Sequence, residues 1–172
     1  MNAEPLVDLV IEEPAWTEAL PDLAILAERA VAAALSAAGQ DPADWQIALL
    51  AASDMRITAL NDRFRAKPTA TDVLSWPAFA TLPPVAQGPR THLGDIAIAF
   101  QTCQRDAESL GIGLKDHATH LILHGCLHLL GHDHMDPDEA AEMEGIETRA
   151  LRGLGIADPH RRRDAAGPRA DR

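Results

Sequence analysis

The chain has 172 residues, of which 47% are hydrophobic, enough to bury the core of one globular domain. No apolar run approaches the ~20 residues of a membrane span, the N-terminus lacks a secretory signal pattern, and two cysteines exclude a disulfide framework. We therefore expect a cytoplasmic protein without membrane contact, and its net charge of −11 is unusual for a protein that binds nucleic acid.

The first half of the chain alternates between strand and helix patterns. Short runs rich in apolar and β-branched residues predict strands. An alanine-rich run that ends at Gly39, and a Ser-Asp pair that suits a helix cap, predict helices. In chain order we expect a strand over residues 6–12, a helix over 22–38, a strand over 46–52 and a helix over 54–62.

The second half continues this alternation. We expect a strand over residues 73–76, a loop over 81–90, a strand over 93–100, and helices over 101–110, 115–130 and from 136 to near Gly153 or Gly155. Four short strands and about five helices predict an α+β fold with a small mixed sheet that contains parallel pairs. Residues 1–156 form the expected single domain, and the arginine-rich residues 157–172 are expected to be a disordered basic tail.

The most informative motif is HGCLHLLGHDH, residues 124–134. His124 and His128 are four residues apart, so a helix places both imidazoles on one face. Gly131 suits the end of that helix, because glycine adopts positive φ without strain. The returning chain then brings His134 to the same place. Three histidines in this arrangement predict a zinc site with one open coordination position.

Two neighbouring residues restrict this interpretation. Zinc proteases carry the motif H-E-x-x-H, in which the glutamate activates water, but Gly125 occupies that position here. The metal-binding frame is metzincin-like, yet the peptidase base is absent. Cys126 lies on the opposite side of the helix from His124 and is expected to be a core residue rather than a fourth ligand.

Three blocks of sequence resemble one known family. The histidine block resembles the signature H-G-x-L-H-L-x-G-[YF]-D-H of the YbeY endoribonucleases, with His132 at the usual aromatic position. LNDRFRAKPTATDVLSWP (residues 60–77) and LGDI (residues 93–96) resemble two further family blocks, in the same order, although Pro68 and Ala70 depart from the pattern. The resemblance covers roughly residues 6–155. It implies a four-stranded mixed sheet with helices packed on it and a central metal-binding helix.

The resemblance also gives Arg65 a role. In the family, the arginine of the R-x-K block lies in the cleft near the metal, where a guanidinium can stabilise negative charge on a phosphorane-like transition state. Four of the eight basic residues that precede Arg149 fall within twelve positions: Arg56, Arg63, Arg65 and Lys67. We expect this stretch to contact RNA phosphates, with a solvent-exposed helix face as the alternative.

Weaker predictions concern the surroundings of the three histidines. His117, His120, His124 and His128 fall within about 80° on one helix face. His120 is a candidate to line the cleft or support a metal ligand, or else a polar residue at the wet edge of the helix. Asp133 either accepts a ring N–H from a ligand histidine and fixes its tautomer or caps the turn.

Together these features predict a zinc-dependent endoribonuclease that is specific for single strands. Its metal is one zinc per chain on His124, His128 and His134, which with Arg65 form the candidate catalytic residues. The resemblance implies action on ribosomal RNA, in late 16S 3′-end maturation and ribosome quality control, beside the small ribosomal subunit or its proteins and not on DNA. Two alternatives stay open: a metzincin-like metalloprotease or other metallohydrolase, and a ribosome-assembly factor with a structural metal.

Overall fold

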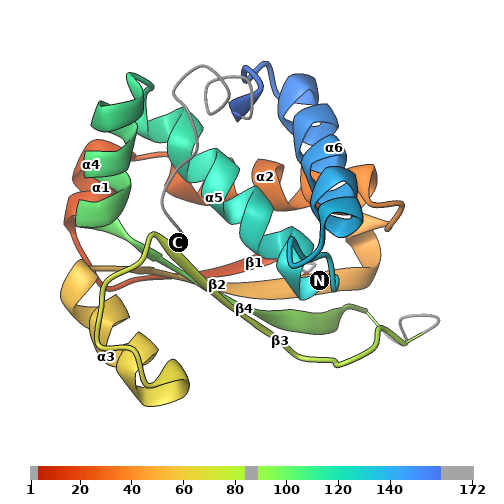
Figure 1. The fold of residues 1–172 in the computed structure, drawn as a ribbon, viewed down its shortest axis with the longest axis horizontal. Helices are drawn as coiled ribbons and strands as arrows, with labels where there is room; N and C mark the ends of the chain where they lie inside the picture. Colours follow the sequence, from red (N-terminus) through yellow and green to blue (C-terminus); the bar gives the residue numbers. More distant parts are fainter. Residues whose placement is uncertain (1–3, 84–88, 160–172) are drawn as a thin grey trace.

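The computed structural model describes residues 4–83 and 89–159, and its elements are shown in Figure 1. In chain order they are β1 (Val7–Ile11), α1 (Ala15–Ala19), α2 (Leu23–Ala37), a 3-10 turn η1 (Pro42–Asp44), β2 (Trp45–Ala52), α3 (Asp54–Arg65), β3 (Val73–Pro77), β4 (Thr91–Ala99), α4 (Phe100–Leu110), α5 (Leu114–Leu129) and α6 (Pro137–Gly153). No helix of this described part is long and apolar enough to cross a membrane.

The four strands form one mixed sheet in the order β1-β2-β4-β3. β1 and β4 both run parallel to β2, whereas β3 is antiparallel to β4. The predicted α+β fold with parallel strand pairs is therefore confirmed. β3 is an edge strand and ends at Pro77, a residue that edge strands tolerate because its missing N–H breaks no internal ladder.

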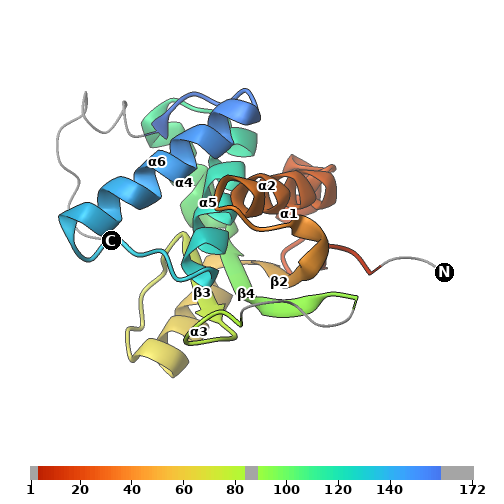
Figure 2. The ribbon, with the colours of Figure 1, turned by 90° about the vertical axis from the view of Figure 1, so that its right-hand side faces the viewer.

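The two faces of the sheet carry different layers of helices. Ile96 and Ile98 of β4 belong to the main core with α2 and α5, whereas Ala97 and Ala99 belong to a smaller cluster with Ile57 of α3. This alternation follows from the two-residue period of a strand. Figures 1 and 2 show the result: α2, α4, α5 and α6 lie on one side of the sheet, and α3 lies on the other.

Gly94 allows the sheet to approach the end of α5. Its φ is +150°, and a Cβ atom at this position would lie 2.4 Å from the Trp76 carbonyl oxygen and 2.8 Å from Leu129 Cδ2. The pairing of β2 with β4 also shifts register beside it, between Gln46 and Ile47. The LGDI block thus contains a glycine because backbone and helix leave no space for a side chain.

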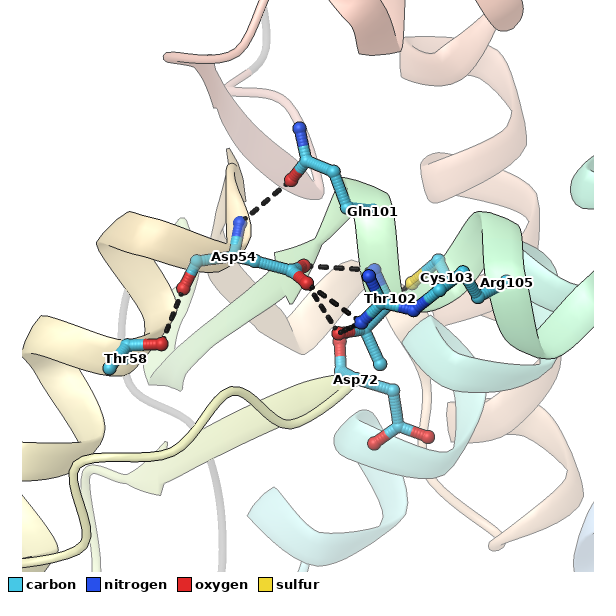
Figure 3. Close-up of polar contacts among 7 residues, drawn as sticks. All are labelled: Asp54, Thr58, Asp72, Gln101, Thr102, Cys103 and Arg105. Carbon is cyan, nitrogen blue, oxygen red and sulfur yellow. Dashed lines mark hydrogen bonds and ion pairs between the residues drawn. The ribbon is translucent and has the colours of Figure 1, made fainter.

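The N-termini of α3 and α4 cap each other, as Figure 3 shows. The Asp54 carboxylate accepts the backbone N–H of Thr102 at 2.9 Å and its hydroxyl at 2.8 Å, while Gln101 Oε1 accepts the backbone N–H of Asp54 at 2.9 Å. Arg105 adds an ion pair to Asp54 at 3.1 Å. α4 needs this external cap because Ala99, its N-cap residue, has no side-chain acceptor.

Most predicted elements are confirmed with small shifts at their ends, but two features differ. α1 and η1 were not predicted, because these short segments depend on packing and caps rather than on periodicity. α3 continues to Arg65, one turn beyond the predicted end, and finishes with Ala66 in the left-handed conformation. Most of the predicted basic tail, residues 160–172, and residues 84–88 of the predicted loop lie outside the described residues.

Candidate metal centre

α5 is the central helix and holds its histidines within a packed core. Eleven of its residues are buried, among them the apolar residues Leu121, Ile122, Leu123, Leu127 and Leu129. The helix ends where it was predicted to end, because Gly131 has a φ of +94° and donates its N–H to the His128 carbonyl oxygen at 3.0 Å. The chain therefore turns back over the last turn of α5.

This turn brings the three predicted histidines together. One ring nitrogen from each of His124, His128 and His134 lies within 4.8 Å of the other two, and the Nε2 atoms of His124 and His128 are 3.0 Å apart. At that distance the two nitrogens can share either a proton or a cation. His124 and His128 are half-buried and His134 is exposed, so the cluster opens toward solvent at one side.

Glu147 of α6 is a functional candidate that the sequence analysis missed. Its side chain is 1% exposed, and its carboxylate accepts hydrogen bonds from Nδ1 of His124 and, at 3.1 Å, from Nε2 of His120. The contact at Nδ1 leaves Nε2 of His124 available toward His128. A carboxylate that holds a ligand histidine by its other nitrogen is a common feature of metal sites.

The apolar pattern of α6 indicates that Glu147 is buried. It follows Met143 by four residues and precedes Ala150 by three, so it lies on the apolar, buried stripe of that helix. The other acids of α6 include exposed residues such as Glu142. A single acid on a buried stripe needs a partner, because an isolated buried charge is costly.

His120 and Asp133 have different environments. His120 is 7% exposed, hydrogen-bonds Glu147, and has its ring centroid 6.1 Å from that of His124. It is therefore buried beside the histidine cluster and does not lie at a solvent-exposed edge of the helix. Asp133 Oδ1 accepts the backbone N–H of His134 at 2.7 Å but lies 3.9 Å from its Nδ1. The shorter contact is that of a turn cap, and the longer one exceeds a hydrogen bond.

His128 has the protonation state that a metal ligand requires. Burial lowers its pKa to about 4, and the neighbouring rings of His124 and His134 add to the effect. The side chain is therefore neutral at pH 7, and no proton has to be displaced from His128 before it binds a cation.

Gly125 explains why the peptidase glutamate is absent. A Cβ atom at this position would lie 3.2 Å and 3.3 Å from two side-chain carbons of Ile96 and 3.4 Å from Val73. The residue after the first histidine thus faces the sheet at close range rather than the open side of the cluster. A glutamate placed there would be directed into the core.

Cys126 is a core residue, as predicted. It is fully buried, and burial raises the pKa of its thiol to about 12, so it holds no thiolate to offer a metal. Among the described residues, it belongs to no group of side chains whose ligand atoms converge.

The basic residues of the second block lie apart from the histidines. Arg63 and Arg65 occupy the last turn of α3 and Lys67 follows it, all exposed, while Arg56 forms an ion pair with Glu12 at 3.3 Å. Within the described residues, Arg65 makes no hydrogen bond or ion pair with His124, His128 or His134. The expected role of Arg65 beside the metal stays a prediction.

β3 separates the basic end of α3 from the histidines. Phe64 of α3 packs on Trp76 with ring centroids 5.8 Å apart, and Val73 of the same strand faces Gly125 of α5. Since β3 is an edge strand, one sheet edge lies between the two groups of residues. A flexible ligand would need to cross this edge to contact both.

The three-histidine cluster fits a zinc ion on its own chemistry. Three imidazoles are a common donor set for zinc, and the exposed side of the cluster leaves space for a fourth ligand. Such a site can polarise an oxygen of a bound substrate or water. The absence of a nearby glutamate on α5 separates it from the zinc-protease arrangement.

Comparisons with known proteins match one family over most of the chain. The model of the family described as Endoribonuclease YbeY matches residues 12–155. A relative in Ruegeria pomeroyi named Endoribonuclease YbeY is 51% identical in an alignment of 164 positions that covers 90% of this chain and 97% of the relative. Another of that name in Maricaulis maris is 43% identical over 172 residues, covering 99% of this chain and 100% of the relative.

A solved structure shows a similar fold. The solution structure of TM1509 from Thermotoga maritima matches with a TM-score of 0.51 and 18% sequence identity. The match covers 89% of this chain and 97% of that one, so the likeness concerns almost the whole fold.

Proposed function

The chain belongs to the Endoribonuclease YbeY family, and from this membership and the three-histidine cluster we propose that it is a metal-dependent endoribonuclease of single-stranded RNA. The observation that carries the proposal is the convergence of His124, His128 and His134 at a side of the molecule open to solvent. The family name supplies the RNA substrate, and the cluster supplies a place for the metal.

The chain's own residues have separate tasks in this proposal. His124 and His128 present Nε2 atoms to a common point, and Glu147 keeps the His124 ring in the required tautomer. His134 completes the set from the turn after α5. A zinc ion, one per chain, would supply Lewis-acid polarisation of a phosphate oxygen or an attacking water.

We propose that the RNA strand crosses the β3 edge of the sheet. Arg63, Arg65 and Lys67 lie at the end of α3 on one side of this edge, and the histidines lie on the other. Their cations would bind phosphates of the same strand that reaches the metal. A flexible single strand can follow such a path more easily than a stiff duplex.

Ribosomal RNA is the substrate that the family resemblance favours. A chain with a net charge of −11 is repelled by RNA outside its few basic residues, so tight non-specific binding is not expected. We propose that the substrate is presented by the small ribosomal subunit or its proteins in the cytoplasm, during late 16S 3′-end maturation and quality control. The zinc would then act on a strand already held in place.

Two other functions are less well supported. A metalloprotease needs a water-activating base, and the position that supplies it in zinc proteases is Gly125, packed against Ile96. A purely structural metal would need a closed set of four protein ligands. The cluster contains three histidines, of which His134 is exposed, and this favours an open site.

One set of digestions separates these functions. Single-stranded RNA and casein are each incubated with the purified protein, with and without a chelator, and zinc is then restored. We expect chelator-sensitive cleavage of RNA, recovery with zinc, and intact casein. Casein digestion would favour the metalloprotease function. RNA cleavage at the same rate with and without the chelator would contradict the metal-dependent mechanism.

A further inference from the structure

A second convergence of metal-binding side chains lies away from the three histidines. Asp72 directly precedes β3, Asp106 belongs to α4, and His117 belongs to the first half of α5. One ligand atom from each residue lies within 4.8 Å of the other two. His117 precedes His124 by about two helical turns, or ~10 Å, so the two clusters share a helix but no residue.

This second cluster is buried, unlike most groups of acidic residues. Asp72 is 7% exposed and His117 is 2% exposed, whereas Asp106 is half-buried and provides an edge toward solvent. Two carboxylates close together in a medium of low dielectric repel each other unless positive charge lies between them. The negative charges of Asp72 and Asp106 also affect Cys103. Burial makes the largest contribution to raising the pKa of its thiol, and the two carboxylates raise it further.

The surrounding structure holds the donors in place. Asp72 Oδ1 accepts the backbone N–H of Val73 at 2.8 Å, and its carbonyl oxygen accepts the N–H of Ala99 at 3.0 Å. In Figure 3 the Asp72 carboxylate extends away from the capping contacts of Asp54. Those contacts hold the N-terminus of α4 in place, and Asp106 lies in the second helical turn of α4.

We propose that Asp72, Asp106 and His117 form a second site, which binds a divalent cation of the Mn²⁺ class and stabilises the fold. Two carboxylate oxygens and one imidazole nitrogen form a harder donor set than three imidazoles, and carboxylates suit Mn²⁺. An ion at this site connects the start of β3, α4 and α5. It neutralises the two carboxylates. The three-histidine cluster, whose donors are softer, would then bind zinc.

The competing explanation is a protonated His117 between two carboxylates. That arrangement also balances charge, but it needs no metal and predicts no specific cation site. The two explanations differ in one measurable property, the stoichiometric binding of Mn²⁺ in a protein whose three-histidine cluster has been disabled.

The test therefore uses the full chain with His128→Ala, freed of metal and titrated with Mn²⁺ while free Mn²⁺ is followed by electron paramagnetic resonance. We expect one Mn²⁺ per chain and a rise in melting temperature. Adding Asp106→Asn should weaken binding at least ~10-fold, because a carboxylate ligand is lost. Adding Asp116→Asn, an exposed acid beside His117, should leave binding unchanged.

Paramagnetic broadening in NMR spectra locates the ion without a further substitution. Bound Mn²⁺ should first broaden the resonances of residues 72–73, 103–107 and 117 in the His128→Ala protein. This result decides the question even if Asp106→Asn fails to fold. Absence of stoichiometric binding, broadening confined to other acidic residues, or equal binding after Asp106→Asn would each overturn the proposal.

Discussion

Glu147 is the residue whose placement says most about how the histidine cluster is held. It reaches His124 and His120 from α6, 23 residues further along the chain than His124. The convergence of the three histidines could be predicted from sequence because their spacing is local to one helix and one turn. The pattern of α6 indicates that Glu147 is buried, but its contact with His124 could not be predicted, because that contact depends on how α6 packs against α5.

Removing the charge of Glu147 should weaken metal binding. In Glu147→Gln, the amide still fills the space but no longer offers a carboxylate to Nδ1 of His124, so we expect a loss of about 10- to 100-fold in zinc affinity. Competition with a chromophoric chelator measures this affinity. Glu142→Gln, an exposed acid on the same helix, is the matched control. Equal zinc affinity in a folded Glu147→Gln protein would refute the role.

Substitution of Arg65 tests the catalytic role that residues 60–77, the second sequence block, imply for this side chain. If it stabilises charge in the transition state, Arg65→Ala should lower kcat by about 10²- to 10³-fold with little change in KM. Arg65→Lys should recover only part of the rate, because an ammonium lacks the paired donors of a guanidinium. Zinc content should not change, and Arg29→Ala on α2 serves as a control.

Steady-state kinetics on single-stranded RNA distinguish the outcomes for Arg65. A rise in KM alone would show that the residue binds substrate at the far side of β3 without stabilising the transition state. Wild-type kinetics would show that the predicted role is wrong. Sequence reasoning could not settle this point, because the distance between α3 and α5 depends on which face of the sheet each helix covers.

At the scale of elements, the close approach of β4 to α5 supports the metal centre. Gly94 lies under Leu129, the last residue of α5, and Gly125 lies against Ile96. The ends of α5 and most strands could be predicted from glycines, caps and apolar runs. The short elements α1 and η1 could not, because a five-residue helix has little intrinsic stability and is formed by its tertiary contacts.

Adding one methyl group at Gly94 should destabilise the fold. In Gly94→Ala the Cβ atom would meet the Trp76 carbonyl at 2.4 Å with φ at +150°, so we expect the free energy of unfolding to fall by at least ~2 kcal/mol. Urea denaturation measures it. Gly113→Ala, which meets nothing within 4 Å, should change it by less than ~1 kcal/mol. Equal stability of the two variants would contradict the described packing.

At the scale of the whole molecule, the protein is acidic, and its described residues include a concentrated group of exposed cations at the end of α3. The net charge of −11 and the basic end of α3 together favour a substrate that is narrow, flexible and presented at one edge of the sheet. The fold class and the convergence of His124, His128 and His134 could be predicted from the sequence. The separation of basic residues and histidines by β3 could not, because strand order follows from long-range pairing.

This arrangement predicts a preference among nucleic acids. Cleavage of unpaired RNA should exceed cleavage of duplex RNA and of DNA, because only a flexible strand can follow the β3 edge and the 2′-hydroxyl distinguishes the sugars. The rate should also fall steeply as salt rises, because phosphate contacts are screened. Matched oligonucleotides of one sequence, single-stranded and annealed, provide the comparison. Equal rates on both RNA forms would remove this part of the proposal.

The central claim is that His124, His128 and His134 hold the metal at which RNA is cleaved. The most direct measurement compares zinc affinity and RNA cleavage in the wild type, in His128→Ala, and in His132→Ala, which alters the same turn outside the cluster. We predict that His128→Ala loses zinc affinity and cleavage together while its fold persists, and that His132→Ala keeps both. A His128→Ala protein that binds zinc tightly and cleaves RNA at the wild-type rate would contradict the account.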